Sequence, residues 1–355
     1  MLKYEGGRYF RQKIICATLA GKSVKLSNVR LEEENVGLAD HEVHFLRLME
    51  TVTNGCVVQI NHTGTQLRYK PGVIMGGSHT FDCGLDRSIG YFLEGLVCLA
   101  PFAKKPFNIT LTGITNDDKD ISVDMFRTVT LPLLKYFGIE EDLELKINRR
   151  GAAPKGGGEI LFRCPVVRTL KPCSLVEPGK MVKIRGIVYS TRISPSIGNR
   201  VVDTAKEILV GFTPNVYIYT DNYSKKEAGL SPGYAVTLVA ESDSGCVLSA
   251  EYCAKPQQLP EDVGKQAAHL LLQEVLQGGC VDSSNQFLVV LFMALCPEDL
   301  SSIKVGKLSP YTIEMLRHLR DFFGIKFKVD PDPDTKTVQL SCLGVGFINY
   351  SKAGI

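Results

Sequence analysis

The sequence predicts an α+β fold made of α/β layers, in which a unit of two helices and a four-stranded sheet occurs three times. The first observation is an order of helix, strand, helix and hairpin that recurs along the chain. The second is that two of the long helices end alike, in Leu134-Lys135-Tyr136-Phe137-Gly138-Ile139 and Arg320-Asp321-Phe322-Phe323-Gly324-Ile325. The third is a much wider spacing between the second and third copies than between the first and second. Units of this size must bury one face of a sheet, so three of them around a common core are expected to form one large domain.

The long helix of each copy follows from the spacing of its apolar side chains. In the first copy Val43, Leu46, Met49 and Val52 recur at helical intervals, and Asn54-Gly55 then ends the pattern. The same reasoning predicts long helices at 40–53, 123–138 and 309–324.

A shorter apolar helix and a strand precede each long helix, and a hairpin follows it. The preceding helix and strand are expected at 11–19 and 23–26, at 89–100 and 107–111, and at 286–295 and 303–305. The hairpins are expected at 56–60 and 66–69, at 143–147 and 159–162, and at 325–329 and 338–342. One more strand is expected to lead into each copy, which makes four strands a sheet.

The spacing of the copies predicts an insertion. The long helices begin at positions 40, 123 and 309, so the second interval exceeds the first by about one hundred residues. The excess matches a segment with its own elements: strands at 182–189, 216–219 and 234–240, a helix after Pro195 and a helix at 261–276. The predicted domains are therefore repeats one and two of the large domain at 1–180, an inserted small α/β domain at 181–278, and repeat three at 279–355.

Composition excludes several classes of protein. The chain has 41 Lys and Arg against 38 Asp and Glu, a net charge of +3, so nucleic-acid binding would need a local basic patch. Its 11 cysteines are odd in number and never form C-x-x-C, which favours reduced, buried thiols over disulfides or a zinc site. The N-terminus is polar, and no run approaches the roughly 18 apolar residues that cross a bilayer. We expect a soluble intracellular protein with no membrane segment, metal site or cofactor.

A glycine-rich segment, Arg149-Arg150-Gly151-Ala152-Ala153-Pro154-Lys155-Gly156-Gly157-Gly158-Glu159, separates the two strands of the second hairpin. Successive glycines let a backbone turn sharply and approach another group closely, and cationic side chains suit phosphate. No Lys-Ser or Lys-Thr follows the glycines, which excludes a Walker P-loop. The motif alone leaves a structural turn and an anion-binding loop equally open.

This segment resembles the glycine-rich signature of the RNA 3′-terminal phosphate cyclase family, and the resemblance covers essentially the whole chain. Gly6-Gly7 with Arg11 resembles the family's N-terminal glycine element, Asn35-Val36-Gly37-Leu38 its Asn-Pro-Gly-Leu turn, and Pro71-Gly72 with Gly76-Gly77 its next glycine pair. The resemblance implies repeated units with a smaller domain inserted before the last, in agreement with the spacing. The residues expected to bind an anion or RNA are Arg11, Arg149, Arg150, Lys155, Gly156, Gly157 and Gly158.

The resemblance also shows where the chain departs from an active cyclase. A cyclase of this family uses ATP to adenylylate a histidine, which then activates the terminal phosphate. Tyr311 matches the position of that histidine, and a phenol cannot readily replace an imidazole. Asn285-Gln286 stands for the family's Asp-Gln, Glu94 for its Gln, and Tyr4-Glu5-Gly6-Gly7-Arg8 for its Glu-Gly-Gly-Gly-Gln. Departures at Tyr311, Asn285, Glu94 and Tyr4 imply that the cyclase chemistry is lost.

The pattern is similar to the cyclase-like branch of the family, through Met49-Glu50-Thr51-Val52-Thr53-Asn54-Gly55, Leu99-Ala100-Pro101-Phe102 and Tyr189-Ser190-Thr191-Arg192-Ile193-Ser194-Pro195-Ser196. This resemblance implies a nucleolar protein of small-subunit ribosome biogenesis. It implies early processing of precursor ribosomal RNA in complex with a nucleolar GTPase of the processome, with the chain a monomer outside that complex.

Two other functions stay open at this point. One is an endoribonuclease that cuts precursor ribosomal RNA, for which the candidates are Arg317, His318 and Arg320, with His318 as the acid or base. The other is a true ATP-dependent RNA 3′-phosphate cyclase. The simpler interpretation of the run Arg317-His318-Leu319-Arg320-Asp321 is a solvated helix face on which Glu314 pairs with Arg317 or His318.

Overall fold

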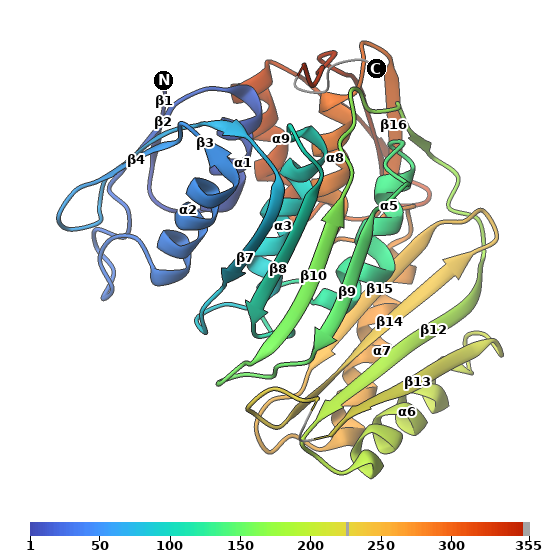
Figure 1. The fold of residues 1–355 in the computed structure, drawn as a ribbon. Helices are drawn as coiled ribbons and strands as arrows, with labels where there is room; N and C mark the ends of the chain where they lie inside the picture. The colour runs from blue at the N-terminus through green and yellow to red at the C-terminus, as the bar shows by residue number, and fades with distance from the viewer. Residues whose placement is uncertain (225–226, 351–355) are drawn as a thin grey trace.

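The computed structural model describes residues 1–224 and 227–350, which form helices and mixed sheets. The α+β fold class expected from the sequence is confirmed. Helices and sheets form layers, and the central helices lie behind the sheet that faces the viewer in Figure 1.

The first four-stranded sheet contains the N-terminus. Its strands, in spatial order, are β1 (Leu2–Glu5), β2 (Val24–Ser27), β5 (Leu67–Lys70) and β4 (Val57–Ile60). The helices of this part are α1 (Phe10–Ala20) and α2 (Asp40–Val52), and β3 (Thr53–Asn54) pairs with β6 (Val73–Ile74). Helix α1 ends at Gly21, whose φ of 63° lies in the left-handed region that favours glycine. Both predicted helices are confirmed to within one or two residues.

The second sheet contains the predicted central hairpin. Its strands, in spatial order, are β7 (Gly77–Asp82), β8 (Phe107–Gly113), β10 (Gly158–Cys164) and β9 (Glu144–Arg149). Its helical segments are α3 (Ile89–Leu99), the short turn η1 (Ala100–Phe102), α4 (Val123–Met125), the π-helical η2 (Phe126–Thr130) and α5 (Leu131–Lys135). The prediction of one regular helix at 123–138 is therefore wrong in its middle and at its end. Pro132 has no N–H and crowds the preceding turn, which disturbs the regular hydrogen-bond ladder.

The third sheet is formed mostly from the C-terminal part of the described chain. Its strands, in spatial order, are β11 (Ser174–Leu175), β16 (Leu300–Val305), β18 (Thr337–Leu343) and β17 (Lys328–Asp332). Its helices are α8 (Gln286–Leu295) and α9 (Pro310–Phe323). Ser309 caps α9, because its Oγ accepts a hydrogen bond from the Thr312 N–H at 3.1 Å, and Gly324 ends the helix with a φ of 77°.

These three sheets share one topology. Counted in chain order, the first strand of each sheet is parallel to the second. The last strand, which is β5, β10 or β18, lies between the second and the third and is antiparallel to both. A parallel pair needs a crossover connection, and α1, α3 and α8 supply it in the respective sheets.

A fourth sheet has a different order and its own helices. Its strands, in spatial order, are β13 (Val216–Tyr223), β12 (Met181–Thr191), β14 (Gly233–Ser242) and β15 (Val247–Cys253). Helices α6 (Pro195–Leu209) and α7 (Pro260–Gln277) lie on one face of it (Figure 1). The sequence did not predict β15, because its burial does not alternate as expected of a half-exposed strand.

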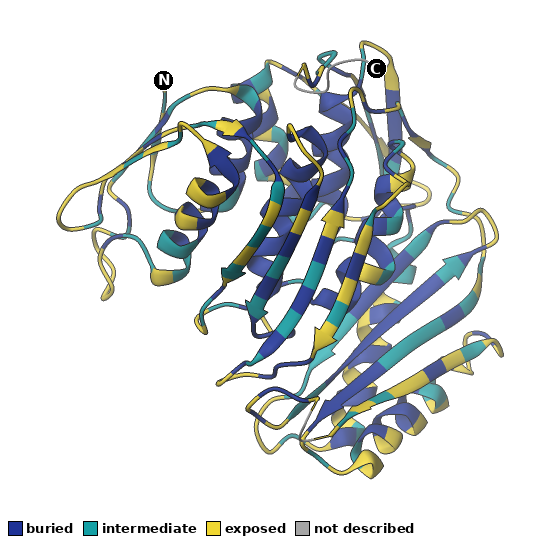
Figure 2. Cartoon of the chain, viewed as in Figure 1, coloured by how far each residue is buried: buried dark blue, intermediate teal, exposed yellow. Residues whose placement is uncertain are grey.

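Two apolar clusters hold the fold together. The larger cluster joins the three similar sheets, and every residue of α3 and α8 is buried in it, as the dark blue helices of Figure 2 show. A helix that is apolar on all sides is stable only in such a core. The smaller cluster lies between the fourth sheet and helices α6 and α7. None of the helices in residues 1–224 and 227–350 has the length and apolar character needed to cross a bilayer.

Candidate functional site

The glycine-rich segment packs against the backbone of residues 229–231. The Gly229 N–H donates to the carbonyl of Arg150 at 2.6 Å, and the Leu230 N–H donates to the carbonyl of Gly156 at 2.9 Å. A Cβ atom on Gly229 would lie 2.2 Å from the Gly156 oxygen, so a side chain cannot fit there. These contacts favour the structural interpretation of Gly156, Gly157 and Gly158 over an anion-binding loop.

Arg150 is a buried structural residue, which corrects the expectation that it presents its guanidinium to a phosphate. Its side chain is fully buried and forms two hydrogen bonds with the buried carboxylate of Asp124, one of them at 2.7 Å. Nη2 also lies 3.2 Å from Asp221 on β13. Burial alone would raise the pKa of Asp124, but Arg150 holds that pKa below its ordinary value. Arg150 therefore ties the second sheet to the fourth.

Arg149 and Lys155 have side chains exposed to solvent. The backbone N–H of Lys155 donates to Ser231 Oγ at 3.0 Å. Of the cationic side chains predicted in the glycine-rich segment, these two remain able to contact a phosphate.

Two of the four positions at which the chain is expected to depart from a cyclase, Tyr311 and Glu94, meet in an ion-paired cluster. The Tyr311 hydroxyl donates to Glu94, and Arg11 Nη2 lies 2.8 Å from the same carboxylate. Burial raises the pKa of Glu94, while Arg11 and Tyr311 oppose the rise. Burial also raises the pKa of Tyr311 well above its ordinary value, so this phenol keeps its proton. A protonated, hydrogen-bonded phenol is a poor nucleophile.

Arg11 is satisfied by acidic and aromatic neighbours, which corrects its expected role as a free anion-binding residue. Besides Glu94, it lies 3.4 Å from Asp120, and its guanidinium lies 4.2 Å from the centre of the Tyr91 ring. Asp120 is shared with Arg87 at 2.6 Å. The sequence did not predict roles for Asp120 and Asp124, although the acidic run before the helix at 123 is a signal for them.

The helix start that carries Tyr311 is held from two sides. Gln12 Nε2 donates to the Tyr311 carbonyl at 2.8 Å, and Gln286 Oε1 accepts from the Ser309 N–H at 3.2 Å. The other two departures lie elsewhere. Asn285 is buried and bonds to Thr130 and Asp282, whereas Tyr4 stacks on Phe322 and bonds to Asp321.

His318 is buried, which corrects the expectation of a solvated helix flank. Its side chain is oriented by Gln12 Oε1, 3.0 Å from Nδ1, and Tyr4 contacts its ring edge to face. Burial, with a smaller contribution from Lys13, lowers the pKa of His318 to about 4. A neutral, enclosed imidazole is poorly placed to act as an acid or base on RNA.

This low pKa predicts a pH-dependent stability. The unfolded chain binds a proton at His318 near pH 6.5 and the folded chain only near pH 4, so acid favours unfolding in that window. We expect this group to remove up to about 3 kcal/mol of stability as pH falls through it. Urea unfolding of the wild type and His318→Gln at pH 7 and pH 4 isolates the effect, because other titrations cancel. A constant difference between the two proteins at both pH values would contradict it.

Arg317 and Arg320 lie on the solvated face of α9. Arg317 pairs with Glu314 three residues earlier, as the simpler interpretation predicted, and Arg320 lies 3.3 Å from Asp321. The three candidates for RNA cleavage are thus two exposed arginines and one buried histidine. They do not converge on a common site.

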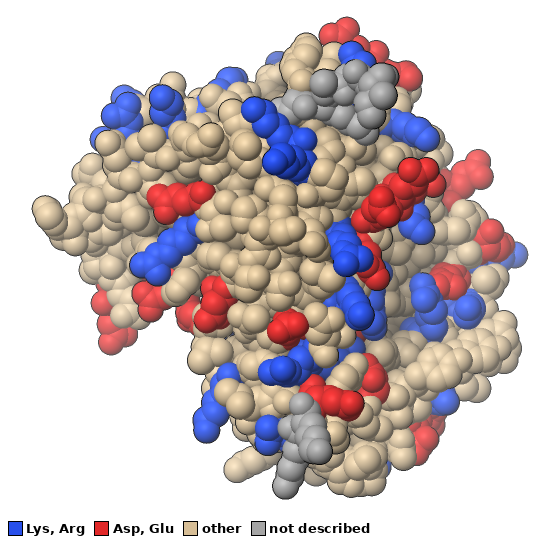
Figure 3. All heavy atoms as spheres, in the orientation of Figure 1, with Lys and Arg blue, Asp and Glu red and all other residues tan. Residues whose placement is uncertain are grey.

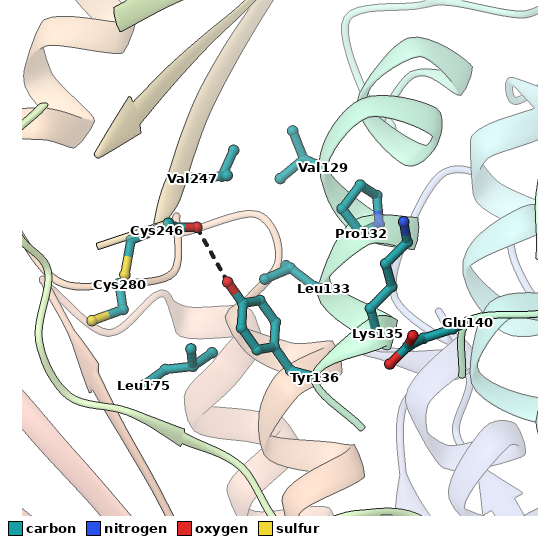
Figure 4. Close-up of a pocket in the computed structure, with 11 residues that line it drawn as sticks. Val129, Pro132, Leu133, Lys135, Tyr136, Glu140, Leu175, Cys246, Val247 and Cys280 are labelled. Carbon is teal, nitrogen blue, oxygen red and sulfur yellow. Dashed lines mark hydrogen bonds between the residues drawn. The ribbon is translucent and has the colours of Figure 1, made fainter. Parts of the chain in front are cut away.

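A cavity of about 400 Å³ lies between α5 and the turn that joins β14 to β15 (Figure 4). The Tyr136 hydroxyl donates to the Gly245 carbonyl at 3.2 Å across it, and Cys246 and Cys280 lie together on one side. All cysteines are free thiols, and most are buried, as expected. In the described part of the chain, no group of three or more His, Cys, Asp or Glu side chains is placed to hold a metal ion.

Comparisons with known proteins give a consistent result along the chain. Residues 2–329 match the family model described as RNA 3'-terminal phosphate cyclase. The chain is 52% identical to the "Probable RNA 3'-terminal phosphate cyclase-like protein" of Dictyostelium discoideum, over 99% of this chain and 100% of that protein. It is 49% identical to the human "RNA 3'-terminal phosphate cyclase-like protein", over 99% and 97% of the two chains. It is 42% identical to the "rRNA processing protein rcl1" of Schizosaccharomyces pombe, again over 99% and 97%.

Proposed function

Because the chain belongs to the RNA 3′-terminal phosphate cyclase family, we propose that it acts in ribosomal RNA processing as a member that does not carry out the cyclase reaction. One relative along nearly its whole length is named an rRNA processing protein, and others are named cyclase-like. The observation that carries the proposal is the cluster of Tyr311, Glu94 and Arg11. Tyr311 stands where the resemblance places the family's adenylylated histidine, and it is a protonated phenol beside a carboxylate that is already paired.

We propose a role in small-subunit ribosome biogenesis, in the nucleolus, in complex with a nucleolar GTPase and precursor ribosomal RNA. The near-neutral net charge of +3 supports delivery by a partner over binding through a strongly basic surface. We expect the GTPase to co-purify with the tagged chain in stoichiometric amount. We also expect the tagged chain to be seen in the nucleolus by fluorescence microscopy.

The fold supports a related proposal about organisation. Three sheets have the same strand order, and the fourth sheet has a separate apolar cluster. We therefore propose that 1–180 and 279–355 are three repeats of one unit in a large domain, and that 181–278 is an inserted domain.

Complementation tests the proposed function. In Schizosaccharomyces pombe cells depleted of the related rRNA processing protein, this chain is expected to restore normal levels of precursor ribosomal RNA, measured by northern blot. An empty vector and the native gene are the two controls. Failure to restore processing at a normal protein level would contradict the proposal.

Two assays test the competing enzymatic functions. Purified chain incubated with radioactive ATP is expected to acquire no covalent label, because no imidazole is present at position 311. The chain is also expected to leave precursor ribosomal RNA intact, because His318 is enclosed. An ATP-derived label would restore the cyclase alternative, and cleavage that His318→Gln abolishes would restore the endonuclease.

A further inference from the structure

The fourth sheet has one face that is covered only in part. Ile184 of β12 and Ile218 of β13 point into the apolar cluster with helices α6 and α7. Side chains alternate along a strand, so the neighbouring residues point to the opposite face. On that face β14 packs on the large cluster through Val239, and Glu251 of β15 accepts from the Ser122 N–H at 2.9 Å. The edge strand β13 and the outer part of β12 extend past this contact (Figure 1).

Two tyrosines stand on the uncovered part. Tyr217 is 47% exposed and Tyr219 is 67% exposed, and they are two residues apart on β13, so they share a face. Arg185 lies directly across from Tyr217 in the parallel pairing of β12 with β13. These side chains, with Lys183, border a groove of about 570 Å³. Exposed aromatic side chains at this spacing form a flat surface on which planar groups can stack.

Cationic side chains surround the two rings. Lys183 Nζ lies 5.9 Å from the centre of the Tyr217 ring, and Arg185 and Arg127 border a smaller hollow beside Tyr219. The side chains of Lys183, Arg185 and Arg127 are 44%, 41% and 39% exposed. Figure 3 shows Lys and Arg side chains gathered over β12 and toward β9.

The carboxylates near these cations are few. Glu241 pairs with Lys183 at 3.6 Å and with Arg185, and its side chain is 26% exposed. Asp124, which lies 3.4 Å from Arg127, is fully buried and already neutralised by Arg150. The side chain of Asp221, two residues beyond Tyr219 on β13, is 31% exposed and pairs with buried Arg150. Counting Arg150, four cations face three carboxylates, so the surface carries a small excess of positive charge that suits a phosphate backbone.

We propose that this face of β12 and β13 binds single-stranded RNA. Two successive bases stack on Tyr217 and Tyr219, while Lys183, Arg185 and Arg127 contact the backbone phosphates. Sheets with helices behind them and aromatic side chains in front bind unpaired nucleotides in this way, because every base has a face that can stack. The site is distinct from the Arg149 and Lys155 surface and deepens the proposed function, on which it rests for RNA as the ligand.

Fluorescence anisotropy of a short labelled single-stranded RNA with the full chain tests the site. Tyr217→Ala and Tyr219→Ala are each expected to weaken binding by about tenfold. Tyr350→Ala removes a tyrosine that is 85% exposed elsewhere and serves as the matched control. Lys183→Gln with Arg185→Gln is expected to reduce the dependence of the affinity on salt, because fewer counterions are released. The affinity for a duplex RNA of the same sequence is expected to be the same for the wild type and the tyrosine variants, because paired bases cannot stack on the rings.

Several outcomes would overturn the site. These are no measurable binding by the wild type, unchanged affinity in folded tyrosine variants, or equal losses in Tyr350→Ala. If the tyrosine variants no longer pull down the GTPase but bind RNA as tightly as the wild type, the face binds a protein instead. The complementation assay tests the proposed function separately, because it uses the wild-type chain. If complementation fails while RNA binding depends on the tyrosines, the proposed function is contradicted and the RNA site stands. If complementation succeeds while RNA binding does not depend on the tyrosines, the site is contradicted and the proposed function stands.

Discussion

Replacing Arg150 with Met is expected to lower the free energy of unfolding by about 3–5 kcal/mol, among the largest effects of any single substitution in this chain. Arg150 and Asp124 are both fully buried, and Asp124 has no solvent contact to replace its partner. A buried charge that loses its partner bears its full desolvation cost, which is larger than the net contribution of the intact pair.

Urea unfolding followed by circular dichroism measures the effect. Lys155→Met is the matched control, because the same type of change at an exposed position nearby is expected to stay within about 0.5 kcal/mol. Adding Asp124→Asn to Arg150→Met is expected to recover part of the loss, since the buried carboxylate, left with only Arg127 at 3.4 Å, then carries no charge. If Arg150→Met were as stable as Lys155→Met, the buried pair would not have the structural role assigned to it.

Replacing Arg11 with Met is expected to cost about 3 kcal/mol at pH 8 and clearly less at pH 5. Glu94 is only 4% exposed at its side chain and would lose its closest cation, so burial would raise its pKa further. Between the ordinary pKa of glutamate and the raised pKa of Glu94, the folded variant keeps a proton on Glu94 that the unfolded chain has released. Folding therefore takes up a proton in this pH range, and the variant loses stability as pH rises through the range.

The pH dependence separates this explanation from a simple loss of packing. Arg317→Met changes an arginine that is 61% exposed and is expected to show a small effect at both pH values. Glu94→Gln in the Arg11→Met background is expected to remove most of the pH dependence. A loss in Arg11→Met that is the same at pH 5 and pH 8 would contradict the proposed role of the Glu94 charge.

Much of the fold could be predicted from local patterns. Helix α8 was expected at the residues where it lies, and α9 is bounded by Ser309 and Gly324 as its sequence indicates. Such elements follow from apolar spacing and end residues, which act within a few positions of one another. The π-helical segment before Pro132 and strand β15 were not predicted, because packing against other parts of the chain outweighs local preference there.

The sequence identified the residues of the candidate site, but it did not predict how far each is buried or which groups it contacts. Tyr311 and Glu94 were each identified as departures from the family pattern, yet their direct contact joins positions 217 residues apart. Arg150 and His318 were expected at the surface because arginine and histidine usually lie there. Their buried partners, Asp124 and Gln12, become neighbours only when helices and sheets pack.

The sequence by itself predicted most of the elements and turns, and it placed a tyrosine at position 311, where the family resemblance implies a histidine, because these depend on residue identity and short-range spacing. The tertiary structure decided which charges meet solvent. It buries Arg150 and His318, leaves the side chain of Arg11 only 12% exposed, and leaves Tyr217 and Tyr219 uncovered. Whether a polar side chain is paired, neutral or free depends on groups brought close from distant parts of the chain, and one-dimensional periodicity carries no information about those groups.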